Sequence, residues 1–202
     1  MTQSFSAMIL SAGFGKRMLP LTNHTPKPLI KINNVSLLKN TIEFLFKIGC
    51  KKIVINTHFK HQLIYDFVKE NYKNSNIIIS YEKNILDTGG GLKNAISLFD
   101  DSNILVTNSD IFWQEQNTDD VIKLISDFRT QDQCRLLLVE KEKACGINNM
   151  CGDFSLKKIM VKRWKKNEKI LYYSGLQIIN LEILKNFKSV SFSFNEVWDL
   201  QI

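Results

Sequence analysis

The stretch Ser6-Ala7-Met8-Ile9-Leu10-Ser11-Ala12-Gly13-Phe14-Gly15-Lys16-Arg17 decides the fold of this 202-residue chain. Its apolar start, residues 6–10, ends abruptly in the glycine loop 11–15, which predicts a buried strand that leads into a loop. Downstream, apolar segments of strand length alternate with segments whose apolar residues recur at helical spacing. This alternation predicts an α/β fold in which helices cover both faces of a mostly parallel sheet.

The expected elements follow one another closely, and an apolar content of 44% is sufficient for the core of one domain over 1–202. Expected strands cover 6–10, 52–56, 77–81, 104–107 and 136–139, and expected helices cover 38–48, 63–68, 92–99 and 121–128. Beyond residue 150 we expect two more strands, 154–164 and 170–179, in antiparallel or mixed pairing. Because an open α/β sheet binds ligands at the carboxyl ends of its strands, polar clusters that follow strands are the candidate sites.

Composition and charge exclude some classes of function. The net charge of +7 comes from scattered lysines, and the densest basic cluster, 157–169, alternates with apolar residues. A solvated strand face or loop explains that cluster better than a nucleic-acid groove, and a positive field would attract nucleotides and phosphorylated sugars. No apolar stretch has the length of a membrane span or the form of a secretory signal. We therefore expect a cytoplasmic protein without a membrane or nucleic-acid partner.

Cysteine and histidine spacing does not favour a metal centre. The four cysteines form no CxxC pair, so in a cytosolic chain we interpret them as reduced, structural thiols. His58 and His61 form an HxxH pattern at the start of a helix, but no acidic third ligand follows at a spacing typical of zinc sites. A surface or capping role is the favoured interpretation of both histidines.

The first polar cluster combines the glycine loop with Lys27, which two prolines flank. Glycines let the backbone approach a phosphate chain and expose N–H donors to it. Arg17 offers a bidentate grip on phosphate oxygens, and Lys27 offers a compact point charge. A Walker A loop would need glycine in place of Leu10, and the dinucleotide fingerprint would need it in place of Met18, so neither motif is present. The loop alone is compatible with a plain turn, and Lys27 shifts the interpretation towards phosphate binding.

Two more clusters follow expected strands. The segment Leu86-Asp87-Thr88-Gly89-Gly90-Gly91 precedes a helix, although glycine costs about 1 kcal/mol relative to alanine in a helix interior. It indicates close approach of a ligand or another backbone, with a plain loop as the alternative. Asn108-Ser109-Asp110 directly follows the strand 104–107. A carboxylate at that place suits Mg²⁺ beside a triphosphate, because Mg²⁺ prefers oxygen ligands and retains waters. The alternative is an aspartate that caps the following turn.

The motif L-S-A-G-F-G-K-R-M-x-P-L-T at 10–22, followed by T-P-K-P-L-I at 25–30, resembles the opening of the sugar-phosphate nucleotidyltransferases. The resemblance implies a Rossmann-like, three-layer α/β nucleotidyltransferase domain with a small antiparallel or mixed C-terminal extension. The nucleotide-binding residues that it implies in this part of the chain are Ala12, Gly13, Gly15, Lys16, Arg17 and Lys27. Two of them are implied to be catalytic, since Arg17 and Lys27 would stabilise the α-phosphate as it is attacked.

The glycine-rich segment 86–91 extends the resemblance. In the family the equivalent segment closes over the nucleobase and ribose, which implies nucleotide-binding roles for Thr88 and Gly89. Its D-T-G-G-G form is similar to the small uridylyltransferases that act on N-acetylmuramate 1-phosphate in cell-wall recycling, and heptose 1-phosphate guanylyltransferases carry a similar T-G-G. Lys83 stands where those uridylyltransferases have a glycine near the base, which leaves the identity of the base open.

The resemblance also implies residues for the metal and the sugar. Asp110 would hold Mg²⁺ and Asn108 would bind the sugar phosphate, with serine in place of the usual glycine between them. The strings Gly152-Asp153-Phe154 and Tyr173-Ser174-Gly175 resemble sugar-contacting segments. Asp153 would then bind a sugar hydroxyl, and Gly175 would let the sugar approach its strand. Family members usually supply a second metal-binding acid from a D-x-G-T-like segment near the C-terminus, and we find no such segment.

The last residues give an expectation about the C-terminus. Ser193-Phe194-Asn195-Glu196 has capping-box spacing, which predicts the start of a helix. The sequence stops at Ile202 after about two turns, and isolated helices shorter than about 12–15 residues are marginal. We therefore expect a chain that stops inside its helix and lacks the end of the domain. A short helix docked by Trp198 is the alternative.

The reaction implied by the resemblance is transfer of a nucleoside monophosphate to a sugar 1-phosphate, with release of pyrophosphate and with Mg²⁺ as cofactor. UTP is the favoured donor and N-acetylmuramate 1-phosphate the favoured acceptor; guanylyl transfer to mannose or heptose 1-phosphate is the alternative. The nucleophile is already an anion, so positioning and charge neutralisation would suffice for catalysis. Two other hypotheses remain: a catalytically impaired protein that binds nucleotide or sugar phosphate, and a nucleic-acid-binding protein, for which no motif is present. The oligomeric state stays open.

Overall fold

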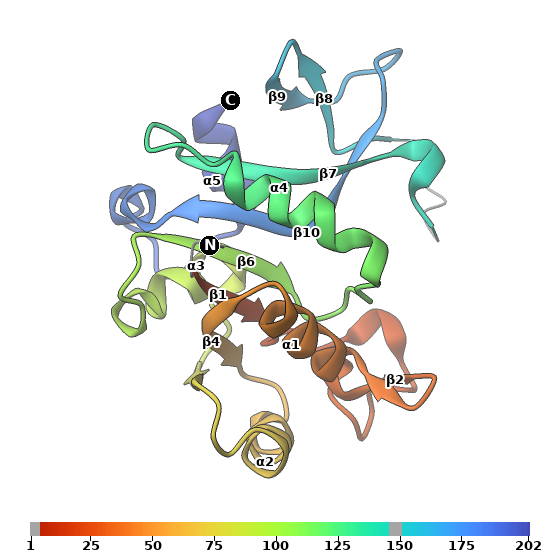
Figure 1. Cartoon of the computed structure of the whole chain (residues 1–202), viewed down its shortest axis with the longest axis vertical. Helices are drawn as coiled ribbons and strands as arrows, with labels where there is room; N and C mark the ends of the chain where they lie inside the picture. Colours follow the sequence, from red (N-terminus) through yellow and green to blue (C-terminus); the bar gives the residue numbers. More distant parts are fainter. Residues whose placement is uncertain (1–4, 146–150) are drawn as a thin grey trace.

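The computed structural model describes residues 5–145 and 151–202, which form a central sheet with helices on both faces (Figure 1). The parallel part of the sheet has the strand order β5-β4-β1-β6. The bounds of these strands are β1 (Phe5–Leu10), β4 (Cys50–Thr57), β5 (Ile77–Tyr81) and β6 (Asn103–Asn108). The expected α/β fold is confirmed, and its first strand lies between two parallel neighbours, where both of its edges are paired.

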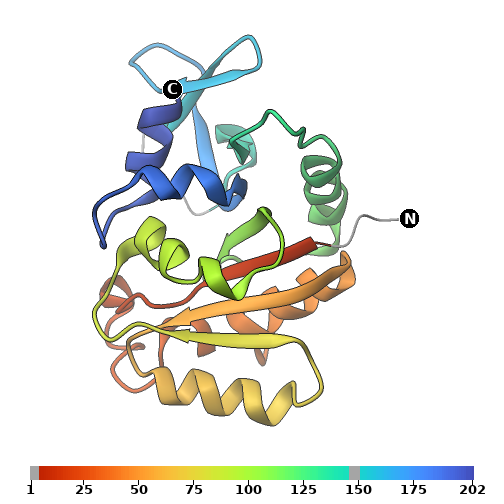
Figure 2. The ribbon, with the colours of Figure 1, turned by 90° about the vertical axis from the view of Figure 1, so that its left-hand side faces the viewer.

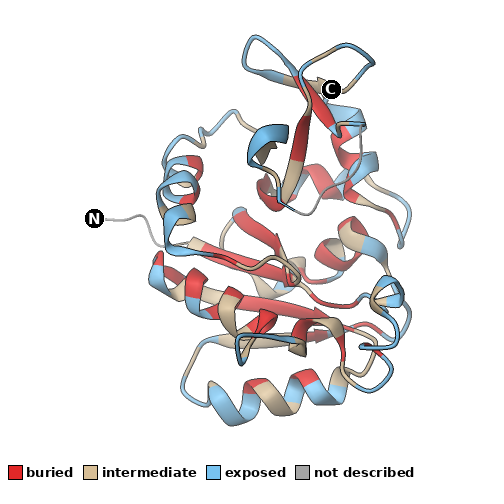
Figure 3. Ribbon diagram, turned by 90° about the vertical axis from the view of Figure 1, so that its right-hand side faces the viewer, coloured by how far each residue is buried: buried red, intermediate tan, exposed pale blue. Residues whose placement is uncertain are grey.

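Side chains along β1 alternate between two hydrophobic clusters. Ala7 and Ile9 pack on the face covered by α1, α2 and α4, whereas Met8 packs on the face covered by α3 and α5. All three side chains are fully buried, and Figure 3 shows the same burial along the central strands. Figure 2 shows α3 and α5 on their common face of the sheet. The helix bounds are α1 (Leu37–Lys47), α2 (His61–Asn71), α3 (Asp87–Asn94), α4 (Thr118–Ser126) and α5 (Phe194–Gln201).

Short elements fill the connections between the strands and helices. A two-residue hairpin, β2 (Lys31–Ile32) with β3 (Val35–Ser36), precedes α1 and was not expected from the sequence. Gly49, at φ 95°, follows the C-cap residue Ile48 and ends α1 in the left-handed conformation that glycine adopts readily. The 3₁₀ helices are η1 (Lys16–Met18), η2 (Lys27–Leu29), η3 (Ile96–Leu98), η4 (Glu115–Asn117), η5 (Lys141–Lys143) and η6 (Leu181–Asn186).

The antiparallel extension is built around β10 (Leu171–Asn180). Its second half pairs antiparallel with β6, and β7 (Cys134–Glu140) pairs antiparallel with β10. The expected strand 136–139 is therefore present, but it does not continue the parallel series. The reason is that β10, which comes later in the chain, occupies the edge of β6 and separates β7 from the parallel strands.

The prediction of a single strand over 154–164 is wrong, because this segment forms a two-stranded hairpin. β8 (Phe154–Lys157) and β9 (Met160–Arg163) pair antiparallel across a turn in which Lys158 has φ 57°. The basic cluster at 157–169 is partly neutralised, since Lys162 forms an ion pair with Glu168 and Lys169 forms one with Glu140. These internal pairs agree with the interpretation of the cluster as a solvated hairpin and loop.

The expected helix 92–99 begins earlier and ends earlier. α3 starts at Asp87, so the three glycines belong to its first turns, and after Asn94 the backbone tightens into η3. The first turn forms because the N–H groups of Gly89 and Gly90 both donate to the carbonyl oxygen of Phe192 at 3.0 Å. Partners from a distant segment thus satisfy donors that an isolated helix leaves unpaired.

The C-terminal helix is docked on the sheet. The side chain of Ser193 accepts from the backbone N–H of Asn195, and Glu196 completes the expected capping box. Trp198 is 8% exposed, and its indole N–H donates to Oε1 of Gln177 in β10 at 2.8 Å. Among the helices of the described residues, none is long and apolar enough to cross a membrane.

Two of the four cysteines are shielded from solvent, Cys50 by full burial and Cys134 by partial burial. Burial raises the pKa of the Cys50 thiol and that of the Cys134 thiol to about 12 each. A thiol with such a pKa carries almost no thiolate at neutral pH and is unreactive. No disulfide links cysteines in 5–145 and 151–202.

Candidate active site

A cavity of about 460 Å³ opens at the carboxyl ends of β1, β4 and β6, which is where an open α/β sheet binds ligands. Its volume lies within the range typical of small-molecule sites. The residues that line it are Leu10, Ser11, Ala12, Gly13, Phe14, Gly15, Lys16, Arg17, Met18, Lys27, Pro28, Asn56, Ile85, Asp87, Thr88, Asn108, Ser109 and Asp110. The structure thus brings together the three polar clusters that follow strands in the sequence.

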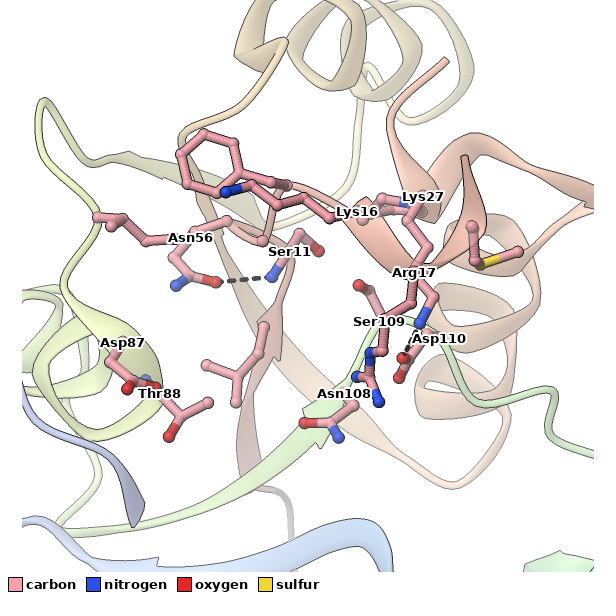
Figure 4. A pocket seen from close by; sticks show the side chains of 18 residues that line it. Ser11, Lys16, Arg17, Lys27, Asn56, Asp87, Thr88, Asn108, Ser109 and Asp110 are labelled. Carbon is pink, nitrogen blue, oxygen red and sulfur yellow. Dashed lines mark hydrogen bonds and ion pairs between the residues drawn. The ribbon is translucent and has the colours of Figure 1, made fainter. Parts of the chain in front are cut away.

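One end of the cavity carries its charged groups. Lys27 donates from Nζ to Oδ2 of Asp110, and the two side chains are 23% and 29% exposed. Lys27 is held by η2, whose neighbouring Pro28 is buried, and Asp110 follows the end of β6. Figure 4 shows Arg17, Lys27, Asn108 and Asp110 gathered at this end, away from Asp87 and Thr88. The predicted catalytic residues and the predicted metal ligand are therefore neighbours.

The glycine loop is shaped to lie close to Lys27. Gly15 has φ 66°, and a Cβ there would lie 2.8 Å from Cγ2 of Thr22 and 3.3 Å from Cβ of Lys27. The hydroxyl of Thr22 also donates to the carbonyl oxygen of Gly15 at 3.0 Å. A Cβ at Gly13 would meet nothing within 4 Å, so the cavity side of that residue is open. Gly15 is needed for the fold of the loop, whereas Gly13 leaves room for a ligand.

A buried hydrogen-bond chain supports the middle of the cavity. The backbone N–H of Ser11 donates to Oδ1 of Asn56 at 2.8 Å, and Nδ2 of Asn56 donates to Oε1 of Glu82 at 2.7 Å. Oε2 of Glu82 accepts from the backbone N–H of Leu86 at 3.1 Å. Asn56 and Glu82 are each 2% exposed. The chain links the glycine loop to the start of α3 and fixes their separation.

The roles of Asn56 and Glu82 were not predicted from the sequence. Asn56 lies at the end of an expected strand, as Asp110 nearly does, and that position was the available signal. Glu82 had no such signal, because its role depends on contacts with residues from other strands. Burial raises the pKa of Glu82, and the hydrogen bonds from Asn56 and Leu86 offset this only in part.

We expect the Glu82 carboxyl to destabilise the fold as the pH rises. Because its pKa is higher in the folded than in the unfolded chain, its contribution to stability is fully present below about pH 4.5, the unfolded value, and is lost as the pH rises through the folded pKa. In Glu82→Gln this loss should be absent, although an amide cannot accept from both Asn56 and Leu86 and lowers stability overall. The free energy of unfolding from urea titrations, measured from pH 4 upwards for both proteins, tests this; parallel pH profiles would contradict it.

The other end of the cavity is formed by α3. Thr88 and Asp87 line it, and Asp87 adopts φ 61° while its Oδ1 accepts from the backbone N–H of Thr88 at 2.6 Å. Gly89 is buried against Phe192 and is not among the residues that line the cavity. Of the two nucleotide-binding residues expected in this segment, the structure brings Thr88 to the cavity.

Of the three residues expected to bind the sugar or its phosphate, one lines the cavity and two do not. Asn108 lines the cavity. Gly175 has φ 89°, and a Cβ there would lie 3.1 Å from Nδ2 of Asn108 and 3.0 Å from Ile111, so this glycine leaves space for the Asn108 amide. Asp153 is exposed, its Oδ2 accepts from the backbone N–H of Tyr173 at 2.9 Å, and neither it nor Gly175 is among the residues that line the cavity.

The donor set around Asp110 fits a divalent metal that arrives with its own oxygen ligands. In the described part of the chain, no group of three His, Cys, Asp or Glu side chains could hold a metal by itself. Mg²⁺ is usually bound through one or two carboxylates, waters and substrate phosphates, and Asp110 supplies one carboxylate at the cavity. The HxxH histidines have other contacts: Nδ1 of His58 lies 2.9 Å from the carbonyl oxygen of Glu82, and the ring of His61 lies against Tyr81.

Comparisons with known proteins identify a family model and relatives that match most of this chain. The family model described as nucleotidyl transferase matches residues 6–146. The chain is 30% identical over 200 residues to the N-acetylmuramate alpha-1-phosphate uridylyltransferase of Caulobacter vibrioides, an alignment that covers 95% of this chain and 82% of that enzyme.

A second relative and a solved structure widen the comparison. The D-glycero-alpha-D-manno-heptose 1-phosphate guanylyltransferase of Aneurinibacillus thermoaerophilus is 32% identical over 104 residues, which span 52% of this chain and 45% of that enzyme. HddC from Yersinia pseudotuberculosis, solved in complex with GMP-PN, has the same fold with a TM-score of 0.74 at 23% identity, covering 94% of this chain and 83% of that chain.

Proposed function

The chain belongs to the nucleotidyl transferase family of sugar-1-phosphate nucleotidyltransferases, and we propose that it transfers UMP from UTP to N-acetylmuramate 1-phosphate or a similar sugar 1-phosphate. The observation that carries this proposal is the Lys27–Asp110 pair at the charged end of the 460 Å³ cavity. A phosphate oxygen of the sugar 1-phosphate attacks the α-phosphorus, the bond from that phosphorus to the bridging oxygen breaks, and pyrophosphate leaves.

The proposal gives the residues of the cavity the following roles. The open backbone at Gly13 and the loop residues Ala12, Gly15 and Lys16 receive the triphosphate. Arg17 and Lys27 neutralise the charge that develops around the α-phosphate, which is the main requirement when two anions react. Thr88 binds the nucleoside at the opposite end, with Gly89 packed behind it.

The acceptor lies on the charged side of the cavity. The Asn108 amide binds the phosphate of the sugar 1-phosphate, and the space that Gly175 leaves beside it allows the sugar ring to approach β10. In this proposal Asp153, whose Oδ2 accepts from the backbone N–H of Tyr173 in β10, binds a sugar hydroxyl.

We assign Mg²⁺ to Asp110. Divalent metals are general in the family, and the Asp110 carboxylate at the charged end of the cavity would suit a magnesium ion, which usually keeps waters and phosphate oxygens as ligands. Bound there, the ion would supply positive charge next to the triphosphate. Lys27 would then exchange Asp110 for a phosphate oxygen, and its ion pair with Asp110 keeps both charged groups at the same end of the cavity.

Guanylyl transfer is the alternative that an observation favours. The heptose 1-phosphate guanylyltransferase matches half of this chain at an identity similar to that of the uridylyltransferase, although the latter aligns over 95% of it. Lys83 stands where the muramate-type enzymes have a glycine near the base, and this difference also leaves guanine open as the base that the protein binds. The greater length of the uridylyltransferase alignment supports UTP as the first choice.

A pyrophosphate-release panel tests the proposal. Each of UTP, GTP, CTP and ATP is combined with N-acetylmuramate, N-acetylglucosamine, mannose and heptose 1-phosphates, in the presence of Mg²⁺. We expect the fastest release with UTP and an N-acetylated sugar 1-phosphate. Preference for GTP with mannose or heptose 1-phosphate would support the alternative. A rise in melting temperature with nucleotide but no release in any combination would indicate a catalytically impaired binding protein.

A further inference from the structure

The segment 190–194, here called the strap, lies between η6 and α5, includes the first residue of α5, and holds the first turn of α3. The N–H groups of Gly89 and Gly90 donate to the carbonyl oxygen of Phe192, and the N–H of Phe192 donates to the carbonyl oxygen of Leu86 at 3.2 Å. None of the strap residues is among those that line the cavity, whereas Thr88, in the turn that they hold, lines it.

Only glycine fits at the three positions 89–91, because α3 has close neighbours on two sides. A Cβ at Gly89 would lie 2.5 Å from the ring of Phe192, and one at Gly90 would collide with the carbonyl oxygen of Val190. On the opposite side, a Cβ at Gly91 would lie 2.6 Å from Oε1 of Glu82. Glycines that weaken an isolated helix are thus required by the close approach of the strap and of the buried chain that ends in Glu82.

The strap also fixes one side chain of the cavity. The backbone N–H of Phe194 donates to Oγ1 of Thr88 at 2.9 Å. A threonine hydroxyl that accepts in this way keeps its own hydrogen for another acceptor. Since Thr88 lines the cavity, a nucleotide there is the acceptor that the hydroxyl can reach.

The strap is itself anchored to the antiparallel extension. Phe194 is 3% exposed and stacks on Trp198, which donates to Gln177 of β10. Arg163 of β9 pairs with Asp199 of α5, with Nε 2.6 Å from Oδ1. The position of Thr88 therefore depends on contacts that begin in the part of the sheet farthest from the glycine loop.

We propose that the strap is a positioning element for the nucleotide, and that nucleotide binding and strap docking stabilise each other. The strap holds the first turn of α3 so that the Thr88 hydroxyl donates into the cavity. By linkage, a nucleotide that uses this hydroxyl must tighten the strap by the same factor by which the docked strap raises nucleotide affinity. This inference rests on the proposed nucleotide-binding function.

Hydrogen exchange of the wild-type protein measures the linkage directly. The probes are UTP with Mg²⁺ and GTP with Mg²⁺, each without sugar phosphate. Protection is read in peptides 11–18 for the glycine loop, 86–94 for α3 and 187–196 for the strap, with the α4 peptide 118–126, which packs on the other face of the sheet, as the internal control. We expect slower exchange in the first three peptides and no change in the fourth.

Gly90→Ala tests the same linkage from the side of the strap. The added methyl pushes against Val190 without entering the cavity and favours helix formation, so the helix itself is not weakened. We expect the dissociation constant and KM for the nucleotide to rise about tenfold, a typical coupling factor, with KM for the sugar 1-phosphate unchanged. Asn94→Ala, an exposed position at the other end of the same helix, is the matched control and should behave as wild type.

The possible results separate this inference from the function that it rests on. Protection in the glycine loop and α3 without protection in the strap would overturn the inference and leave the proposed function standing, as would unchanged nucleotide affinity in folded Gly90→Ala. If the glycine loop itself shows no protection with any nucleotide, the proposed function and the inference both fail. If Gly90→Ala does not fold, the exchange result on the wild-type protein decides.

Discussion

Asp110→Asn should reduce pyrophosphate release by about 10²–10³-fold, the loss typical of a removed electrostatic contact at a reacting centre. The amide keeps the shape of the side chain but removes the charge that would hold Mg²⁺. It also removes the partner of Lys27, whose ammonium then faces the triphosphate without competition. We therefore expect nucleotide binding without metal to be retained or strengthened, while turnover at saturating Mg²⁺ is lost.

Stability separates this result from unfolding. Asp110 is 29% exposed, and ion pairs near a surface contribute only about 0–1 kcal/mol. The melting temperature should therefore fall by no more than a few degrees. Turnover of Asp110→Asn within tenfold of wild type, in a protein that melts normally, would remove Asp110 from the proposed site.

Lys27→Ala should lower turnover by about 10²–10³-fold, because the lysine supplies fixed positive charge at the α-phosphate as the sugar 1-phosphate attacks. Lys27 is 23% exposed and is held by η2 next to the glycine loop, so its ammonium is already at the charged end of the cavity before substrate arrives. The loss should fall mainly on kcat, since the charge is needed most in the transition state. Steady-state kinetics with UTP and a sugar 1-phosphate give the split.

Lys16→Ala is the matched control for Lys27→Ala. It removes the same charge from the same cavity, but the Lys16 ammonium lies 5.2 Å from the centroid of the Phe14 ring, away from the Lys27–Asp110 pair. We expect this variant to raise KM for the nucleotide severalfold with kcat nearly unchanged. Equal losses in the two lysine variants would show that general attraction of the triphosphate, rather than positioned charge at the α-phosphate, accounts for the effect of Lys27.

The parts of the site that the sequence predicts are those carried by one continuous segment. The strand, the glycine loop and Lys27 lie within 25 residues, and their spacing fixes what they can contact. Asp110 was also accessible, because a carboxylate directly after a buried strand belongs to the ligand-binding edge of such a sheet.

The parts that could not be predicted depend on pairing between distant segments. Glu82 becomes a support of the cavity only when β4 and β5 lie side by side. The triple glycine indicated that another group approaches closely. The sequence cannot show whether that group is a ligand or the backbone of Phe192, a residue about 100 positions later in the chain. The direction of β7 likewise depends on β10, a strand that follows it in the sequence.

The position of β10 has a consequence for the order in which the chain folds. β6 is synthesised some 65 residues before Leu171–Asn180, the strand that pairs with its outer edge. Until then the edge of β6 presents unpaired N–H and C=O groups, the arrangement that invites pairing with another chain. At synthesis rates of about 5–20 residues per second this exposure lasts several seconds. Nascent chains of this protein are therefore most prone to aggregate between the emergence of β6 and the emergence of β10.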